Sequence, residues 1–196
     1  MKKKPTASPA IRSARHAVLN WLNAADRPER LAVTLTFKRA AMREEPTTGR
    51  RFWERLDGIT ASKNTRHFLN RLSKAIYGAA FNRYGKRLRS FVVLEGGRDR
   101  RPHVHLELEC PAHMPVEDFE RLILKCWAET AFGYDESKIT RYSDDGWSDY
   151  LLKLATKEDN DIGRRPDGYS ESNYSLDVYS SSIDWQNVCI DRSVVE

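Results

Sequence analysis

The strictest pattern in this sequence is the alternation of apolar and polar residues in two seven-residue segments, LAVTLTF at 31–37 and HVHLELE at 103–109. Successive side chains of a β-strand point to opposite faces. Each segment therefore predicts a strand with one apolar and one polar face. The apolar faces consist of Leu31, Val33, Leu35 and Phe37 in the first segment and of Val104, Leu106 and Leu108 in the second.

Amphipathic helical segments lie between the predicted strands. Apolar residues recur at helical spacing from Thr65 onward, with Ser62 or Asn64 as the predicted N-cap and Gly85 near the end. A second helix is expected to open at Pro115, because proline suits the first turn of a helix. The two apolar stripes consist of Phe68, Leu69, Leu72, Ala75, Ile76, Ala79 and Ala80, and of Phe119, Leu122, Ile123, Cys126 and Trp127.

Two more strands, a loop and a short helix complete the predicted order. Residues 89–95 and 138–142 have strand character, whereas the charged segment 38–62 predicts a long loop with a short helix near 52–56. Residues 147–157 predict a final short helix. The order β-α-β-β-α-β is typical of the α+β split β-α-β (ferredoxin-like) fold, an antiparallel four-stranded sheet with helices on one face.

In that arrangement the first and third strands are central, and the sheet face away from the helices is polar. This open face is predicted to carry Thr34, Thr36, His103, His105 and Glu107. A polar open face is ordinary for such a fold, but a pair of histidines at its centre is not. The pair therefore marks the place to look for a functional site.

Charge is distributed unevenly along the chain. Residues 1–101 contain 24 Lys and Arg against 8 Asp and Glu, whereas residues 102–196 contain 9 against 20. A basic surface on the first half is typical of proteins that bind phosphate backbones. The alternative is an ordinary solvated surface combined with a basic N-terminal arm.

Composition excludes several classes of protein. Mean hydropathy is −0.67, and no apolar run approaches the 18 or more residues of a transmembrane helix, so no membrane association is expected. The basic start lacks the apolar stretch of a secretory signal, and a cytoplasmic location is expected. The three cysteines form no CxxC pair, which argues against a zinc ribbon or a disulfide scaffold. No phosphate-binding glycine-rich motif is present.

The histidine pair and a nearby glutamate form a candidate metal site. His103 and His105 leave the same strand face about 7 Å apart, and the turn GGRDRRP brings Glu95 alongside them. Two imidazoles and one carboxylate leave coordination positions open on a divalent cation, as binding of a phosphate oxygen requires. The alternative is a chance pair on a solvated face, and Glu107 and Glu109 are rival ligands on the same face.

Tyr150 and Lys153 form a second candidate element. They lie three residues apart on a predicted helix and so share one side of it. A nearby cation favours the phenolate form of tyrosine, which is the nucleophilic form. The alternative is that Tyr150 is a half-buried aromatic that anchors the helix, while the Lys153 stem lies along the surface.

With LAVTLTF, HVHLELE and YLLK in this order, and Glu95 eight residues before the first histidine, the chain resembles the HUH-type rolling-circle replication initiators. It is most similar in character to the replication proteins of filamentous phages and small plasmids. The resemblance covers roughly residues 30–158. Two-tyrosine members carry YxxKYxxK, whereas this chain has YLLKLATK, with Leu154 in the second position. This departure implies a single nucleophile, with Tyr142 as the fallback.

The resemblance implies a site-specific single-strand DNA endonuclease and ligase, a nickase that initiates rolling-circle replication. Mn²⁺ or Mg²⁺ would be held by Glu95, His103 and His105. Tyr150 would form a 5′-phosphotyrosyl link, and Lys153 would stabilise the charge on the phosphate. The expected organisation is a flexible basic arm over 1–27, an HUH-like endonuclease domain over 28–158 and a polar tail over 159–196.

The expected partner is single-stranded DNA at a replication origin. Thr36 in the first motif and Arg98, Arg100 and Arg101 in the basic loop are predicted to contact DNA, although the three arginines could equally be a solubilising hairpin tip. No helicase domain is present, so a host or phage helicase and a polymerase are expected to act with the protein.

Three alternative functions remain open from the sequence. The chain could be a nucleic-acid-binding or repressor module without catalysis, although the predicted open face offers Thr and His, with no Phe or Tyr on the third strand for the base stacking typical of RNA-binding sheets. It could instead be a related relaxase or transposase. It could also be a metal-dependent hydrolase in which water replaces Tyr150 as the nucleophile.

Overall fold

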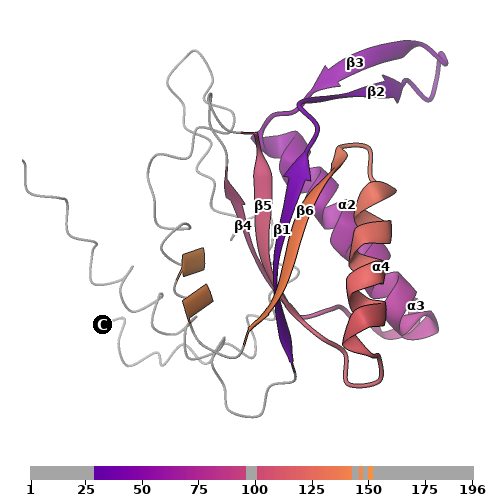
Figure 1. Cartoon of the computed structure of the whole chain (residues 1–196). Coiled ribbons are helices and arrows are strands. Elements are labelled where there is room, and N and C mark those ends of the chain that lie inside the picture. Colours follow the sequence, from indigo (N-terminus) through magenta and orange to yellow (C-terminus); the bar gives the residue numbers. More distant parts are fainter. Residues whose placement is uncertain (1–28, 96–100, 143–145, 148–149, 152–196) are drawn as a thin grey trace, which may run out of the picture.

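A computed structural model of the chain describes residues 29–95, 101–142, 146–147 and 150–151. The expected basic arm at 1–27 and the polar tail at 159–196 lie outside the described residues. The described part has an α+β fold built on an antiparallel sheet, which confirms that much of the expectation (Figure 1). No helix in it is long and apolar enough to cross a lipid bilayer.

The main sheet has four strands in the order β4-β5-β1-β6. These strands are β1 (Arg30–Phe37), β4 (Ser90–Glu95), β5 (His103–Glu109) and β6 (Gly133–Tyr142). All three pairings are antiparallel, and β1 and β5 occupy the centre as predicted. The last strand is longer than the predicted 138–142, because residues from Gly133 onward already pair with the end of β1.

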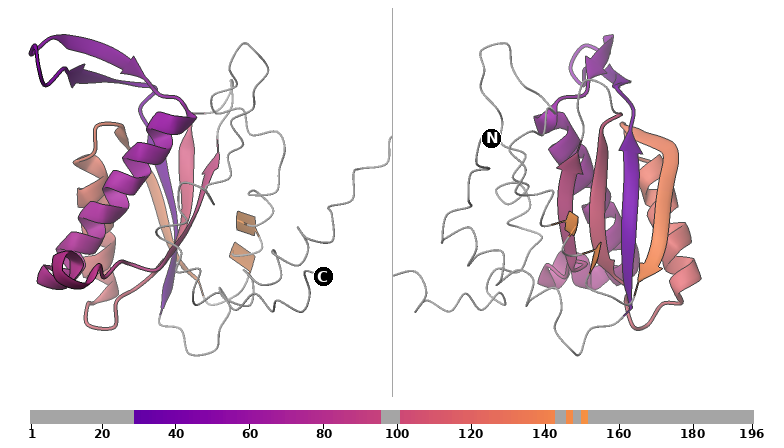
Figure 2. Two further views of the ribbon diagram at one scale, coloured as in Figure 1. Left: turned by 180° about the vertical axis from the view of Figure 1, so that it is seen from behind. Right: turned by 60° about the vertical axis from the view of Figure 1, so that its left-hand side comes forward.

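Three helices lie on one side of this sheet, and the first and last of them pack against it (Figure 2). They are α2 (Gly58–Tyr77), α3 (Ala79–Tyr84) and α4 (Val116–Ala128). The apolar faces of β1 and β5 and most of the stripes of α2 and α4 form one buried cluster, as their periodicity predicts. Ala75 and Ala79, predicted as part of the first stripe, are instead exposed, and Gly78 separates α2 from α3. The opposite face of the sheet carries the polar residues of β1 and β5, together with Glu95 and the buried apolar side chains of Phe91 and Val93 from β4.

The segment predicted as a loop with a short helix is instead a β-hairpin. Strands β2 (Ala40–Glu44) and β3 (Arg51–Arg55) pair with each other in a separate two-stranded sheet. Its turn is closed by a bond from the N–H of Glu45 to the carbonyl of Arg50 and by one from the N–H of Gly49 to the carbonyl of Glu45. The positive φ of Gly49, 68°, suits glycine. Dense charge in 38–62 hid this strand signal, because exposed hairpin strands need no apolar face.

The first helix also begins earlier than predicted. The Asp57 carboxylate accepts a 2.7 Å hydrogen bond from the backbone N–H of Thr60, so Asp57 is the N-cap and the helix starts at Gly58. Ser62 and Asn64 are therefore buried residues inside α2 rather than caps.

Trp127 of α4 fixes the end of β1 against the helices. Its indole ring packs edge-on against Phe37 and Phe68, and its Nε1–H donates to the backbone carbonyl of Thr36 at 3.2 Å. Gly133 passes so close that a Cβ atom there would lie 2.1 Å from the Trp127 carbonyl oxygen. This close approach holds β1 and β6 at the end of the sheet where β1 terminates.

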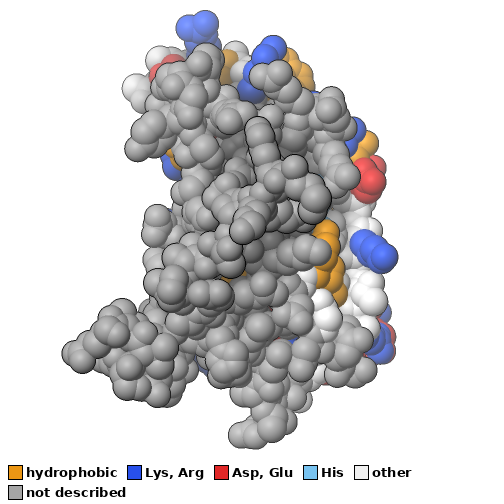
Figure 3. Space-filling model, turned by 90° about the vertical axis from the view of Figure 1, so that its left-hand side faces the viewer, with side chains coloured by type: hydrophobic (Ala, Val, Ile, Leu, Met, Phe, Trp, Pro, Cys, Tyr) orange, Lys and Arg blue, Asp and Glu red, His pale blue; other side chains and the backbone are white. Residues whose placement is uncertain are grey.

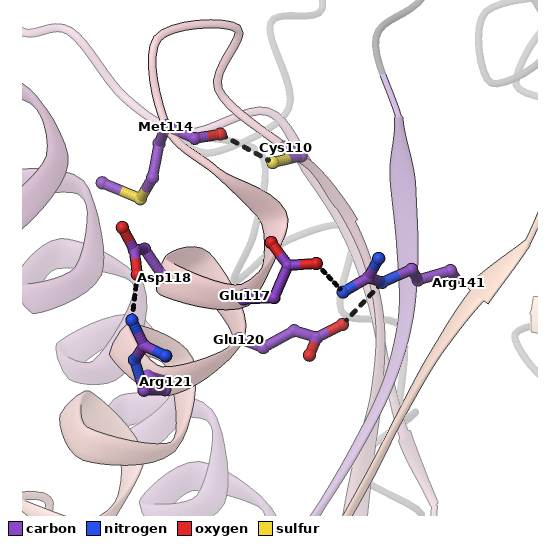
Figure 4. A network of polar contacts seen from close by, with 7 residues as sticks. All are labelled: Cys110, Met114, Glu117, Asp118, Glu120, Arg121 and Arg141. Atoms are coloured by element: carbon purple, nitrogen blue, oxygen red, sulfur yellow. Dashed lines mark hydrogen bonds and ion pairs between the residues drawn. The ribbon is translucent and has the colours of Figure 1, made fainter.

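Salt bridges attach the other end of β6 to α4. The guanidinium of Arg141 donates to Glu117 at 2.8 Å and to Glu120 at 3.0 Å (Figure 4). Nearby, Asp118 pairs with Arg121 on the same helix, and the Cys110 thiol lies 3.7 Å from the Met114 carbonyl. The Arg141 contacts therefore fasten the edge strand β6 to α4, which lies on the face of the sheet away from the open one.

Candidate metal and tyrosine site

Strand pairing brings the three predicted ligands together. Glu95 is the last residue of β4 and lies directly opposite His103, the first residue of β5. His105 lies two residues further along β5 and therefore on the same face. Residues 96–100, which connect the two strands, lie outside the described residues, and the pairing of β4 with β5 fixes the register.

The three side chains converge on one point. The Oε2 atom of Glu95 lies 3.2 Å from Nε2 of His103 and 2.9 Å from Nε2 of His105. One ligand atom from each residue lies within 4.8 Å of the other two. The imidazole rings meet edge to face with centroids 4.7 Å apart. Atoms at this spacing could all bind a single divalent cation.

The outer nitrogen of each imidazole is also engaged. The Nδ1–H of His103 donates to the backbone carbonyl of Arg101 at 2.9 Å, because a carbonyl can only accept. Nδ1 of His105 lies 3.0 Å from the hydroxyl of Thr34. A hydroxyl can donate or accept, so Thr34 suits either neutral tautomer of His105. Outer hydrogen bonds of this kind aim the inner nitrogens of metal-binding histidines, and the residues present therefore fit a metal ion.

The protonation of the cluster also suits metal binding. Burial lowers the pKa of His105 below its ordinary 6.5, and the charge of His103 adds to this, although Glu95 opposes it. Burial by itself raises the pKa of Glu95, but the hydrogen bond from His105 and the charges of both histidines outweigh it and hold the pKa below 4.5. At neutral pH the site thus holds an ionised carboxylate and a neutral His105 imidazole, the forms that bind cations.

The rival carboxylates have other partners. Glu107 is buried, and its carboxylate forms an ion pair with the guanidinium of Arg30 at 3.3 Å. The carboxylate of Glu109 lies 3.6 Å from the guanidinium of Arg89. Within the described residues, the candidate ligand group contains Glu95 and the two histidines, without Glu107 or Glu109.

Tyr150 lies beside the cluster on the open face of the sheet. Its ring centroid is 5.7 Å from that of His105, in an edge-to-face arrangement, and the side chain is 41% exposed. Figure 1 shows the described residues 146–147 and 150–151 on the side of the sheet opposite α2 and α4. The tyrosine is thus close to the candidate ligands and accessible from solvent.

Trp147 holds this aromatic contact in place. Its ring stacks on Tyr150 at a centroid distance of 5.3 Å and contacts His105 at 5.5 Å. The indole Nε1–H donates to the backbone carbonyl of Leu106, in the middle of β5, at 3.1 Å. Trp147 therefore connects the tyrosine segment to the same strand that carries both histidines.

The remaining predicted residues are distributed differently. Thr36 lies opposite His103 and is buried, and its carbonyl accepts from Trp127. Arg101 is exposed, and its guanidinium lies 4.1 Å from the ring centroid of Tyr134. Lys153, Arg98 and Arg100 lie outside the described residues. Their predicted roles in phosphate and DNA contact stay predictions.

Thr34 and Trp147 have roles that the sequence reasoning missed. Alternation placed Thr34 on the polar face, and pairing of the first and third strands puts it opposite His105, so a register argument could have found its hydrogen bond. No comparable signal exists for Trp147, since its contacts depend on where the chain after β6 returns to the sheet.

Comparison with protein-family models finds none that matches the chain, and comparisons with curated proteins and with solved structures find no match either.

Proposed function

We propose that this protein is a metal-dependent tyrosine endonuclease and strand transferase that nicks single-stranded DNA at a replication origin, in the manner of HUH-type rolling-circle initiators. The observation that carries the proposal is the double contact of His105, which touches both the Glu95 carboxylate and the Tyr150 ring. A candidate cation site and a candidate nucleophile thus meet at one imidazole. The proposal includes the ferredoxin-like class for the fold, with Tyr150 on a short helix over the open face.

A divalent cation held by Glu95, His103 and His105 would polarise the scissile phosphate and favour the tyrosine phenolate. Mn²⁺ and Mg²⁺ both suit phosphate oxygens, and the two imidazole ligands favour Mn²⁺. Arg101 and Thr34 orient the imidazoles through their outer nitrogens.

The chain's own part in the reaction falls to Tyr150. Its hydroxyl loses a proton to solvent, and the phenolate oxygen attacks phosphorus. A 5′-phosphotyrosyl bond forms, the bond from phosphorus to the 3′-oxygen breaks, and that oxygen leaves as a 3′-hydroxyl after taking up a proton. The reverse attack by a 3′-hydroxyl restores the phosphodiester and frees the tyrosine, so one residue serves both cleavage and ligation.

Other predicted residues have supporting roles in this proposal. Lys153 would neutralise charge on the phosphate, and Thr36, Arg98, Arg100 and Arg101 would contact the DNA strand. The basic first half of the chain is consistent with phosphate contacts, which supply much of the affinity of DNA-binding proteins. Strand separation and synthesis would need a helicase and a polymerase as partners.

The proposal is tested with a pool of randomised single-stranded DNA, because the recognition sequence is not needed in advance. The protein is incubated with the pool and Mn²⁺, and species that survive denaturing electrophoresis are isolated and sequenced. We expect a protein–DNA adduct enriched in one sequence motif. The adduct should disappear when Tyr150 is replaced by Phe and when Mn²⁺ is chelated.

Two outcomes of this experiment would contradict the proposal. Cleavage that persists in the Tyr150→Phe variant would indicate a hydrolase that uses water as its nucleophile. Sequence-selective DNA binding without cleavage in any divalent metal would indicate a binding or repressor module on the same fold.

A further inference from the structure

The β2–β3 hairpin projects beyond the end of the main sheet (Figures 1 and 2). A bond from the N–H of Leu56 to the carbonyl of Arg39 closes its base, and a bond from the N–H of Lys38 to the carbonyl of Phe132 joins that base to the body. Nothing in the proposed cleavage reaction explains why the protein should carry such an element. The residues on the surface of the hairpin therefore indicate what it could bind.

Large apolar side chains are exposed on this hairpin. Trp53 is 67% exposed and Met42 is 48% exposed, and the register places them directly opposite each other on one face. Phe52, on the other face, is 44% exposed. Tryptophan has an apolar ring of large area and is enriched in binding surfaces. An exposed Trp–Met pair on a projecting hairpin thus suits contact with a flat apolar surface.

Basic side chains surround this pair. Residues 38–56 include six Lys and Arg against three Glu. Arg43 and Arg51 pair with Glu54 and Glu44, whereas Arg39, Arg50 and Arg55 have no ion-pair partner within the part of the chain that the structure describes. Figure 3 shows basic side chains beside apolar ones along the upper edge of the molecule, where the hairpin lies.

The arginines and the tryptophan share a face. Arg51 and Arg55 are each two residues from Trp53 on β3, so all three side chains leave the same side of the strand. Aromatic rings that stack on bases, interleaved with arginines that bind phosphates, are the combination with which proteins hold single-stranded nucleic acid. A protein partner would be matched less well, because the apolar patch consists of only two side chains and positive charge is in excess around it.

The hairpin also lies at the same end of the sheet as the candidate metal cluster. Thr36 lies opposite His103 near the end of β1, and β2 begins four residues later at Ala40. The candidate metal cluster and the hairpin base are therefore neighbours at one end of the sheet. A nucleic acid strand that crosses the cluster can continue onto the hairpin.

We propose that the β2–β3 hairpin binds the single-stranded DNA that flanks the cleavage position, with a base stacked on Trp53 beside Met42 and phosphates held by Arg51 and Arg55. The choice of DNA as the strand rests on the proposed nicking function. The binding itself requires neither the metal cluster nor Tyr150.

The test measures binding to a 5′-fluorescein-labelled thymidine oligonucleotide by fluorescence anisotropy, in the full chain carrying Tyr150→Phe so that no covalent link forms. Trp53→Ala should weaken binding about tenfold, the loss typical of one base–aromatic contact, and Trp53→Phe should restore most of it. Arg55→Ala should weaken binding and reduce its salt dependence.

The matched control is the helix α3, which also carries an exposed aromatic beside an exposed arginine. Tyr84 is 81% exposed and follows Arg83. Tyr84→Ala and Arg83→Ala should change binding less than twofold. Equal loss in the α3 variants, or binding of Trp53→Ala within twofold of its parent, would overturn the proposal. So would Trp53-dependent binding confined to RNA of the same length.

Failure of this proposal can be separated from failure of the proposed function. If the wild-type chain nicks DNA but Trp53→Ala binds normally, only the hairpin proposal is overturned. If Trp53-dependent DNA binding is found in a chain that never nicks DNA, the hairpin proposal is supported and the nicking function is overturned.

Discussion

At the scale of single residues, Glu95 is the centre of the candidate site, because one of its oxygen atoms lies within hydrogen-bond distance of both histidines. Replacing Glu95 or His105 by Gln removes one ligand of three. Loss of a ligand is expected to weaken Mn²⁺ binding by tenfold or more, measured by isothermal titration calorimetry. His113→Gln is the matched control, since this histidine lies in the loop before α4 and outside the cluster. Equal affinity in the Glu95→Gln variant would exclude the site.

Protons and metal ions compete for the imidazole nitrogens, which gives a pH dependence with a defined sign. The pKa of His105 lies below its ordinary 6.5, so its imidazole is neutral at neutral pH and takes up a proton only as the solution becomes acidic. We expect Mn²⁺ affinity to fall as the pH is lowered below about 6.5, measured in a series of titrations. Affinity that is constant or higher in acid would contradict neutral imidazole ligands.

The residues of the cluster could be predicted from the sequence, but the tyrosine contact could not be derived in the same way. A His-x-His pair on an alternating strand fixes the shared face, and a short turn brings Glu95 beside it. Tyr150 follows a segment whose path depends on packing, and its position came only from a family resemblance. The Trp147 bond to the Leu106 carbonyl is a long-range contact that no local pattern contains.

At the scale of secondary-structure elements, the open face depends on how α4 packs against β1 and β6 from the other side of the sheet. Gly133→Ala would force a Cβ atom against the Trp127 carbonyl, 2.1 Å away. We expect a loss of about 3 kcal/mol in the free energy of unfolding, measured by urea denaturation. The control is Gly49→Ala in the hairpin turn, where space is open but φ is positive, with an expected loss of about 1 kcal/mol. Equal losses in the two variants would contradict this packing argument.

Trp147 is expected to position the tyrosine segment rather than to hold the metal. Trp147→Leu removes both the stacking on Tyr150 and the bond to β5. The adduct-forming rate should fall about tenfold or more, while Mn²⁺ affinity stays within twofold, because a positioning residue leaves the ligands intact. Parallel loss of metal affinity would show instead that Trp147 supports the cluster.

Element prediction succeeded where one face is buried and failed where neither face is. The alternation in 31–37 and 103–109 correctly predicted two strands and the face of the sheet on which each residue lies, and the order of elements predicted that both strands are central. Alternation is strict there because one face of each strand is buried. The β2–β3 hairpin is exposed on both sides, so its strands show charge rather than alternation. The start of α2 was misplaced because Asp57 caps the helix before the apolar stripe begins.

At the scale of the whole molecule, we expect the basic first half of the chain to bind the phosphates of the DNA strand that the site on the open face is proposed to cleave. DNA binding by the Tyr150→Phe chain should weaken steeply with salt, because each phosphate contact releases counterions. The slope of log affinity against log salt, measured by anisotropy, should be about −2 or steeper for a strand held by several arginines. A slope near zero would contradict a phosphate-binding surface.

The most direct test of the account is to locate the covalent link to DNA. Trypsin cuts after Arg141 and Lys153 and so releases residues 142–153, a peptide that contains both Tyr142 and Tyr150. Fragmentation of the nucleotide-bearing peptide by mass spectrometry then distinguishes the two tyrosines. The account predicts a phosphotyrosyl nucleotide on Tyr150, formed only with a divalent metal. A link on Tyr142, or no link in a reaction that cleaves DNA, would contradict it.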